Sequence, residues 1–285
     1  MATGSPPSVP GFDHAVVDVQ DRMDEAARRY RALGFRLTDR GRHSMGSVNH
    51  LAMFGTDYLE LLGTGDAGGP VRQELVGFPV GLNGLVFKLE DADRRYAELK
   101  ERGLAVLPVN RFARPLMLDG KQEEARFHTV RLEPRTVFDG RVYFCQHLTP
   151  QFVWRPEWQA HPNGAVAITR LVIAARDPAR SAAVFDRMFG AGACAPADGG
   201  GRLLRAGTVR IEIVPHAALA AELGDAVPDG LGRADFLALL GLRVGSLPKT
   251  GDVLRAGGIA RVRSGPKHLL VHPAEAMNVA LEFSA

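Results

Sequence analysis

The stretch GFDHAVVDVQD, residues 11–21, decides the fold, because it has the alternation of a β-strand and a histidine within the run. A strand sends successive side chains to opposite faces, which predicts one face with Phe12 and His14 and another with Asp13 and Ala15. The second face, rich in alanine and valine, is the one that a helix would cover. His14 is therefore expected on the uncovered face, either as a hydrogen-bonded structural histidine or as a ligand-binding residue.

Length and composition describe an ordinary globular protein. The 285 residues are enough for about two domains with proper cores. Hydrophobic residues make up 46% of the chain, charged residues make up 24%, and the net charge is +3. Like charges do not cluster, which argues against nucleic-acid and membrane partners. No apolar run approaches the roughly 18 residues of a membrane helix.

Cysteine usage and the N-terminal segment point to the cytoplasm. Cys145 and Cys194 lie in separate segments without CxxC spacing, which argues against a disulfide framework and against a cysteine-based zinc site. The segment MATGSPPSVPG, residues 1–11, lacks the basic and apolar regions of a signal peptide. We therefore expect a cytoplasmic protein.

A repeated unit organises the chain. Residues 22–33 place apolar side chains at helical spacing, and Gly34 follows as a stop signal. Strand-like runs are expected at 35–40, 47–55 and 57–63. Together with the first strand, this order predicts a βαβββ unit.

The same pattern returns three more times. It begins again at residue 81, with later strands at 125–133 and 141–148, then at 168, and more weakly near 236. In each of the first three copies, an aspartate follows the first-strand position by seven residues and precedes the helix. A glycine 12 or 13 residues after that aspartate ends the helix. Such regular spacing indicates one unit used repeatedly.

A proline-rich segment separates the second copy from the third. The run TPQFVWRPEWQAHPNGA, residues 149–165, contains three prolines and two tryptophans. Proline disfavours both helix and strand, so a crossover is expected here. The predicted domains are residues 11–150 and 165–285, and the tryptophans are expected to pin the crossover onto them.

The paired units, together with DHAVVDVQD (13–21), YLELLG (58–63) and YFCQHLTPQFVWRPEW (143–158), resemble the vicinal oxygen chelate superfamily and its glyoxalase-like domain proteins. The resemblance implies an α+β fold of the glyoxalase/bleomycin resistance/dihydroxybiphenyl dioxygenase type. Tandem βαβββ units would form two paired-unit domains. Each pair would form a cup, in which a divalent metal chelates two adjacent oxygens of a substrate.

Carried over to this chain, the resemblance places His14 at the first-strand ligand position and Glu60 at the fourth-strand position. Alternation independently puts Glu60 on the face opposite Leu59 and Leu61, where a carboxylate needs a cation or a donor. Imidazole and carboxylate together suit Mn, Fe, Zn or Ni. Glu60 is the candidate catalytic residue, as a ligand or a base, and a salt bridge to an arginine is its structural alternative.

The second unit departs from the family pattern. Its first-strand position is Gly84, which has no side chain but leaves room for a ligand to approach the backbone. Its fourth-strand position is assigned to Gln146 as the third metal ligand, with His147 expected on the opposite face. His147, His50 and His128 are the other candidates, and each also has a structural interpretation. Two further residues are expected to line the cup, namely Asn49 and Tyr58.

The second domain is expected to be degenerate. Arg170 takes the place of His14, and Glu212 takes the place of Glu60. Arginine stays protonated and cannot bind a metal, so it should pair with Glu212 or Glu282 or hold an anionic ligand. This half is expected to have a structural or substrate-covering role.

Two functions remain open, besides a third alternative in which the chain is an interaction or regulatory module with no bound small molecule. The first is a metal-dependent enzyme, of isomerase/lyase or dioxygenase type, that acts on a small molecule with adjacent oxygens. The second is a metal-free protein of the same fold that binds and sequesters a small molecule. In both, the partner is a small molecule rather than nucleic acid or a membrane, and association into homodimers is left open.

Overall fold

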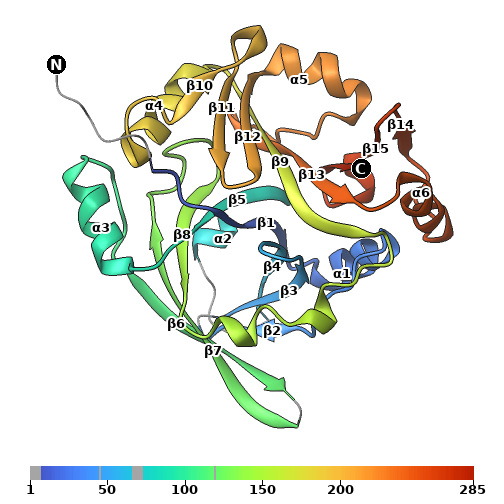
Figure 1. Ribbon diagram of the computed structural model, residues 1–285, viewed down its shortest axis with the longest axis horizontal. Coiled ribbons are helices and arrows are strands. Elements are labelled where there is room, and N and C mark those ends of the chain that lie inside the picture. Colours follow the sequence, from blue (N-terminus) through green and yellow to red (C-terminus); the bar gives the residue numbers. More distant parts are fainter. Residues whose placement is uncertain (1–7, 45, 66–72, 119) are drawn as a thin grey trace.

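The computed structural model describes residues 8–44, 46–65, 73–118 and 120–285, and it contains two eight-stranded sheets. The first has the strand order β2-β3-β4-β1-β5-β8-β7-β6, and the second has the order β10-β11-β12-β9-β13-β16-β15-β14. In Figure 1 the blue and green half carries the first sheet, and the yellow to red half carries the second. The two orders are the same, which shows four βαβββ units in two pairs.

The first sheet comes from the N-terminal half. Its elements are β1 (Phe12–Gln20), α1 (Met23–Ala32), β2 (Gly41–Arg42), β3 (Ser47–Met53), β4 (Tyr58–Thr64), α2 (Gln73–Val76), β5 (Gly81–Lys88), α3 (Ala92–Glu101), β6 (Asn110–Leu118), β7 (Lys121–Arg131) and β8 (Arg141–His147). The 3₁₀ turns η1 (Pro150–Phe152) and η2 (Pro156–Trp158) follow, in the expected crossover.

The second sheet repeats this order. Its elements are β9 (Ala165–Ala175), α4 (Pro178–Phe189), β10 (Cys194–Pro196), η3 (Asp198–Gly200), β11 (Arg202–Ala206), β12 (Val209–Pro215), α5 (His216–Leu223), η4 (Gly224–Ala226), β13 (Phe236–Val244), α6 (Leu247–Ala256), β14 (Val262–Ser264), β15 (His268–Val271), η5 (Pro273–Glu275) and β16 (Ala280–Ser284). The proposed domain limits, 11–150 and 165–285, enclose the two sheets.

The repeated aspartates explain two of the helix starts. Asp91 accepts a hydrogen bond from the backbone N–H of Arg94, and Asp177 accepts from those of Ala179 and Arg180. These are N-caps, which satisfy donors that the first helical turn leaves free. The first helix differs, because its N-cap is Arg22 and makes no side-chain cap.

Two strand expectations need correction. Residues 35–40 form no strand, and the second strand is only Gly41–Arg42. The segment 110–118, which the pattern did not identify, forms the nine-residue strand β6. It carries Pro115 and polar residues and pairs only with β7, so it is an edge strand, where proline is tolerated.

The buried apolar side chains form one large cluster that joins the two halves and a smaller cluster on the opposite face of each sheet. One apolar cluster joins both halves and includes Ala15, Leu59, Leu171 and Phe185. Each opposite face has its own smaller cluster, one around Val16 and Tyr58 and the other around Val172 and Leu239. The opposite faces of the two sheets therefore do not share one core.

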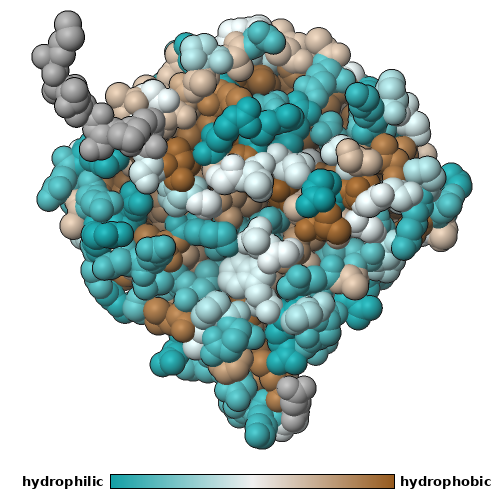
Figure 2. All heavy atoms as spheres, in the orientation of Figure 1, coloured by the Kyte–Doolittle hydropathy of each residue, from teal (hydrophilic) through white to brown (hydrophobic). Residues whose placement is uncertain are grey.

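The surface carries no dominant apolar area on the face shown in Figure 2, where hydrophilic and smaller hydrophobic patches alternate. Among the described residues, no helix is long and apolar enough to cross a membrane.

Candidate active site

A cavity opens on the face of the first sheet that carries His14, Val16, Tyr58 and Glu60, which we call the first cup. Strand pairing places Tyr58 beside His14 and Glu60 beside Val16. The polar residues that line the cavity are His14, His43, Asn49, Glu60, Asn110, Arg114, Thr129, Arg131, Arg141 and Tyr143. Its apolar wall includes Leu51, Leu62, Phe112, Phe127, Val142 and Val153.

His14 is oriented by its chain neighbour. The pairing of β1 with β5 slips between Phe12 and His14, so Asp13 lies at a β-bulge. A bulge breaks the regular alternation, and the Asp13 Oδ1 atom lies 2.5 Å from His14 Nδ1. Phe12 packs in the helix-side core instead of the cup, which corrects the expected alternation at this end of the strand. The bulge thus brings a carboxylate to the imidazole that should have faced away.

Asp13 stays ionised although it is buried. Burial opposes its charge, but the charge of His147 and hydrogen bonds from His14 and His147 outweigh this and hold the pKa of Asp13 below its usual range. An ionised Asp13 only accepts hydrogen bonds, so His14 Nδ1 carries a proton and donates it. In the neutral ring that a metal ligand requires, the lone pair is then on Nε2, which faces the cup.

Three groups meet at His14 Nε2. Glu60 Oε2 lies 3.7 Å away, and the Tyr143 hydroxyl lies 3.2 Å away. The ring of Tyr58 stacks on the imidazole with centroids 4.3 Å apart and 12° between the planes. Glu60 Oε1 accepts a hydrogen bond of 2.6 Å from the Asn49 side chain. The expectation that His14 meets Glu60 on adjacent strands is confirmed.

The donor set at this point suits a divalent metal. A nitrogen and an oxygen 3.7 Å apart can both lie about 2.1 Å from one ion, as in zinc sites. A ligating histidine commonly donates its other ring nitrogen to a carboxylate, which is the arrangement of His14 and Asp13. His14 and Glu60 would hold the ion, with the Tyr143 hydroxyl next to it.

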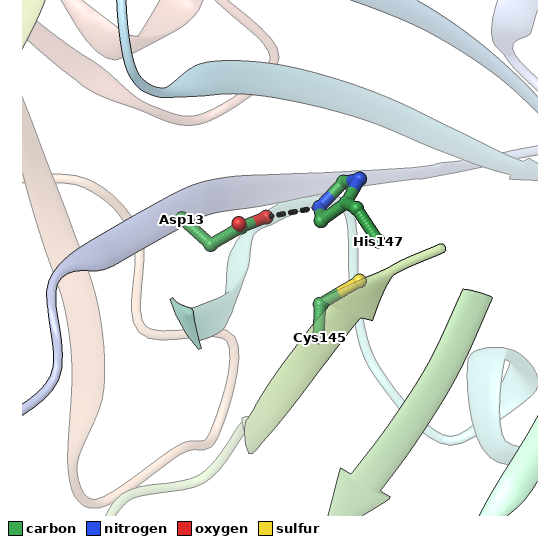
Figure 3. Close-up of side chains that lie close together, drawn as sticks. All are labelled: Asp13, Cys145 and His147. Atoms are coloured by element: carbon green, nitrogen blue, oxygen red, sulfur yellow. Dashed lines mark hydrogen bonds and ion pairs between the residues drawn. The ribbon is translucent and has the colours of Figure 1, made fainter. Parts of the chain in front are cut away.

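A second cluster of side chains of the kinds that bind metals lies next to His14. Ligand atoms of Asp13, Cys145 and His147 lie within 4.8 Å of one another (Figure 3). The dashed line in Figure 3 is the 3.1 Å hydrogen bond from His147 Nε2 to Asp13 Oδ1. Burial raises the pKa of the Cys145 thiol well above its usual range, so without an ion this thiol is protonated. These three residues are a possible metal-binding triad.

The other expected ligands lie elsewhere. Gln146 bonds to the backbone of Glu90 and Ala92, outside the cup, and His128 pairs beside it on β7. The reason is parity on β8, where Tyr143, Cys145 and His147 share the cup-side face and Gln146 has the opposite one. The assignment of Gln146 to the cup and of His147 to the opposite face was therefore wrong.

His50 and Gly84 also differ from expectation. His50 pairs with Leu61 on the helix side, and its ring bonds to the backbone carbonyl of Thr38 at 2.8 Å. Burial lowers its pKa, as expected of a neutral structural histidine. A Cβ on Gly84 would lie 2.6 Å from Val16 Cβ, so this glycine lets two strands approach and leaves no room for a ligand.

Tyr143 occupies the position that sequence reasoning gave to Gln146. Glu60 pairs with Val16, two residues after His14, and Tyr143 pairs with Val86, two residues after Gly84. Counting strand pairs from the first-strand position could have found it.

In the second cup, β9 and β12 pair in the same register as β1 and β4, but they carry different residues. Arg210 pairs with Arg170 and Glu212 with Val172, as Tyr58 and Glu60 pair in the first cup. Arg170 donates to Glu212 at 2.8 Å, to Glu222 at 2.6 Å and to Glu282 at 3.2 Å. The expected pairing of Arg170 inside the second cup is confirmed.

Comparison with known proteins identifies relatives at the level of family and fold. A model of the glyoxalase-like domain family matches residues 12–189. No curated protein matches the chain.

Solved structures with the same fold include three of low sequence identity. A hypothetical protein from Staphylococcus aureus is 10% identical, with a TM-score of 0.67 over 96% of this chain and 98% of that one. A fusion of a xylose isomerase-like TIM barrel with 4-hydroxyphenylpyruvate dioxygenase is 13% identical, with a TM-score of 0.59 over 99% of this chain and 51% of that one. A mutant of 4-hydroxymandelate synthase from Streptomyces coelicolor is 12% identical, with a TM-score of 0.56 over 98% and 92%.

Proposed function

Because the chain belongs to the glyoxalase-like domain family, we propose that it is a metal-dependent enzyme whose first cup acts on a small molecule with two adjacent oxygens. The observation that carries the proposal is His14, held by Asp13 on one side and facing Glu60 on the other. Both cysteines are unpaired, which agrees with the cytoplasmic location that we also propose.

Each polar residue of the first cup has its own role in the proposed reaction. Asp13 fixes the ring of His14 and keeps its Nε2 lone pair directed at the substrate side. Asn49 holds one oxygen of Glu60, and the other oxygen faces His14 Nε2, where it can bind an ion or move a proton. The Tyr143 hydroxyl can donate to a substrate oxygen in place of its bond to His14. A divalent ion bound at this pair would polarise a substrate carbonyl or stabilise an enediolate.

The ligand types favour isomerase or lyase chemistry over dioxygenase chemistry. Non-haem iron oxygenases use two histidines and one carboxylate on one face of the metal. In the described part of the first cup, His14 and Glu60 supply one of each, and the third position is that of Tyr143. Proton transfer between neighbouring carbons or oxygens needs only a polarised oxygen and a base, which this set provides.

A binding protein of the same fold is the second candidate. It is favoured by the second unit, whose first strand contributes Gly84 and Val86 and therefore no metal ligand. Such a protein would hold the small molecule in the same cup without a metal.

Metal titration distinguishes these candidates. We expect wild-type protein freed of metal to bind Zn²⁺, Mn²⁺ or Ni²⁺ in a calorimeter, and His14→Ala and Glu60→Gln to lose the binding while staying folded. Glu212→Gln is the matched control, since Glu212 has the equivalent register position in the second cup. Absence of metal uptake by the wild type, or its persistence in both first-cup variants, would contradict the proposal.

A further inference from the structure

A buried cation in the first cup is not used by the proposed metal pair. Arg114 on β6 lines the cavity and is only 4% exposed. With the residues that the structure describes, it makes one hydrogen bond, from Nη1 to Asn49 Oδ1 at 3.4 Å, and its Nε is buried without a partner among them. No carboxylate in the described part of the chain lies within ion-pair distance of it. Burying a charge without a counterion is costly, so a structural role does not explain this side chain.

Arg141, on the same cavity wall, differs from Arg114 in having a counterion, although the Nε of each is buried without a partner. Its guanidinium bonds to the buried carboxylate of Asp18. The charge of Arg141 is thus balanced by the chain itself. Among the described residues, Arg114 hydrogen-bonds to one neutral amide, so its charge is available to a ligand in the cavity.

A glycine next to Arg114 leaves space for its side chain. A Cβ on Gly41 would lie 2.7 Å from Arg114 Cδ, and it would also collide with the Asn49 side chain. The missing side chain at Gly41 lets the guanidinium reach Asn49. Burial lowers the pKa of Arg114, and the charges of Tyr58 and Glu60 oppose this.

Arg114 lies one side chain away from the proposed reaction centre. Asn49 accepts from Arg114 and donates to Glu60 Oε1 at 2.6 Å, and Glu60 Oε2 lies 3.7 Å from His14 Nε2. Phe112 and Phe127 line the same cavity. A molecule that presents an oxygen to Glu60 and His14 can therefore place a charged end at Arg114 and an apolar body against the rings.

We infer that the substrate is a small organic acid whose carboxylate pairs with Arg114, which rests on the proposed function of the first cup. The planar guanidinium matches a carboxylate through two parallel hydrogen bonds, and a binding site that excludes water strengthens them. The oxygen on the carbon next to the carboxylate would then reach Glu60 and His14. Arg114 thus selects an anion with an apolar group over its neutral counterpart.

The test compares an acid with its uncharged form. Phenylglyoxylate carries a carboxylate, an adjacent carbonyl and a ring, and phenylglyoxylamide has the same shape without the charge. Binding of both is measured by calorimetry to wild type, Arg114→Met, Arg114→Gln and Arg114→Lys, with phenylphosphonate as the phosphate-like anion. Arg111→Met is the matched control, because Arg111 lies on the same strand but is exposed and pairs with Asp93.

We expect the wild type and Arg111→Met to bind the acid at least about tenfold more tightly than the amide. Arg114→Met and Arg114→Gln should bind both alike, and Arg114→Lys should keep part of the preference. The inference is overturned if the wild type shows no preference or no binding at millimolar acid, or if both neutral variants keep the preference. Tighter binding of phenylphosphonate than of the acid would overturn the assignment of a carboxylate.

Metal titration of the same variants separates this inference from the proposed function. Arg114→Met leaves His14 and Glu60 in place, so it should still take up metal. Lost discrimination with intact metal uptake supports the role of Arg114 alone. Intact discrimination in a wild type that binds no metal would contradict the enzyme proposal and leave the acid preference standing.

Discussion

The two cups share a backbone and differ in what their equivalent residues do. In the first cup, His14 and Glu60 face a cavity, and in the second cup Arg170 and Glu212 face each other. The second cup is also packed by α5, whose Leu219 is buried in the apolar cluster of that face. At the same register, arginine thus replaces histidine, and an ion-pair network replaces the pair of cavity-lining residues.

The balance of buried charges distinguishes the two cups. Arg170 is surrounded by the carboxylates of Glu212, Glu222 and Glu282. Burial opposes the charge of Arg170, but the hydrogen bonds that Arg170 donates to Glu222 and Glu212 raise its pKa. The first cup reverses this, since Arg114 lacks a carboxylate partner among the described residues. In the second cup, carboxylates of the chain neutralise Arg170, whereas in the first cup the charge of Arg114 is available to a ligand.

The largest effect is expected in the second cup. Arg170→Met removes the guanidinium that bridges Glu212 and Glu282, which are 20% and 17% exposed at the side chain, and should destabilise the protein by about 3 kcal/mol at neutral pH. Urea unfolding measures this. Arg210→Met is the control, since Arg210 is 49% exposed and its pair with Glu212 should contribute less than about 1 kcal/mol. Equal losses in the two variants would contradict the central place of Arg170.

The contact between the two halves gives the next effect, which depends on pH. Asp57 accepts a hydrogen bond from the backbone N–H of Ile168 on β9, and burial raises the pKa of Asp57 to about 6 despite that bond. The native state therefore holds a proton that the unfolded chain loses, and stability falls as pH rises from about 4 to about 6. Asp57→Asn avoids this loss and should be more stable than wild type by up to roughly 3 kcal/mol at pH 7.5.

Denaturant unfolding of wild type and Asp57→Asn at two pH values checks this prediction. The advantage of the variant should shrink below about 1 kcal/mol at pH 4, where the carboxyl is protonated in the native state. An advantage that is the same at both pH values would show that Asp57 is not the titrating group.

The smallest effect concerns the support of His14. Asp13→Asn removes the carboxylate that orients the imidazole and should weaken metal binding about 10- to 100-fold, as outer ligand partners do. Cys145→Ser should leave metal affinity unchanged if the ion lies at His14 and Glu60. A loss in both variants of comparable size would instead place the ion in the triad of Asp13, Cys145 and His147.

The sequence was sufficient for the fold and for half of the site. Regular spacing from Asp91 and Asp177 to their helix-ending glycines predicted the repeated unit, since caps and stops are local signals. Strict alternation placed Glu60 on the face of the first cup, where its Oε2 lies 3.7 Å from His14 Nε2. Such periodicities need no knowledge of distant contacts.

The errors come from breaks in periodicity and from contacts between distant strands. The bulge at Asp13 has no local sequence signal, and it turned an expected outward carboxylate into the partner of His14. Gln146 was chosen instead of Tyr143 because the strand register was misjudged. The two positions differ by an odd number of residues, so their side chains lie on opposite faces of the sheet. Arg114 was missed because β6 was not recognised as a strand.

The central claim is that the first cup, and not the second, holds a divalent metal at His14 and Glu60. Anomalous diffraction from a crystal soaked in Mn²⁺ or Zn²⁺ tests it most directly. We predict one strong peak between His14 Nε2 and Glu60 Oε2 and none near Arg170. A peak bound only by Asp13, Cys145 and His147, or no peak within the first cup, would contradict the account.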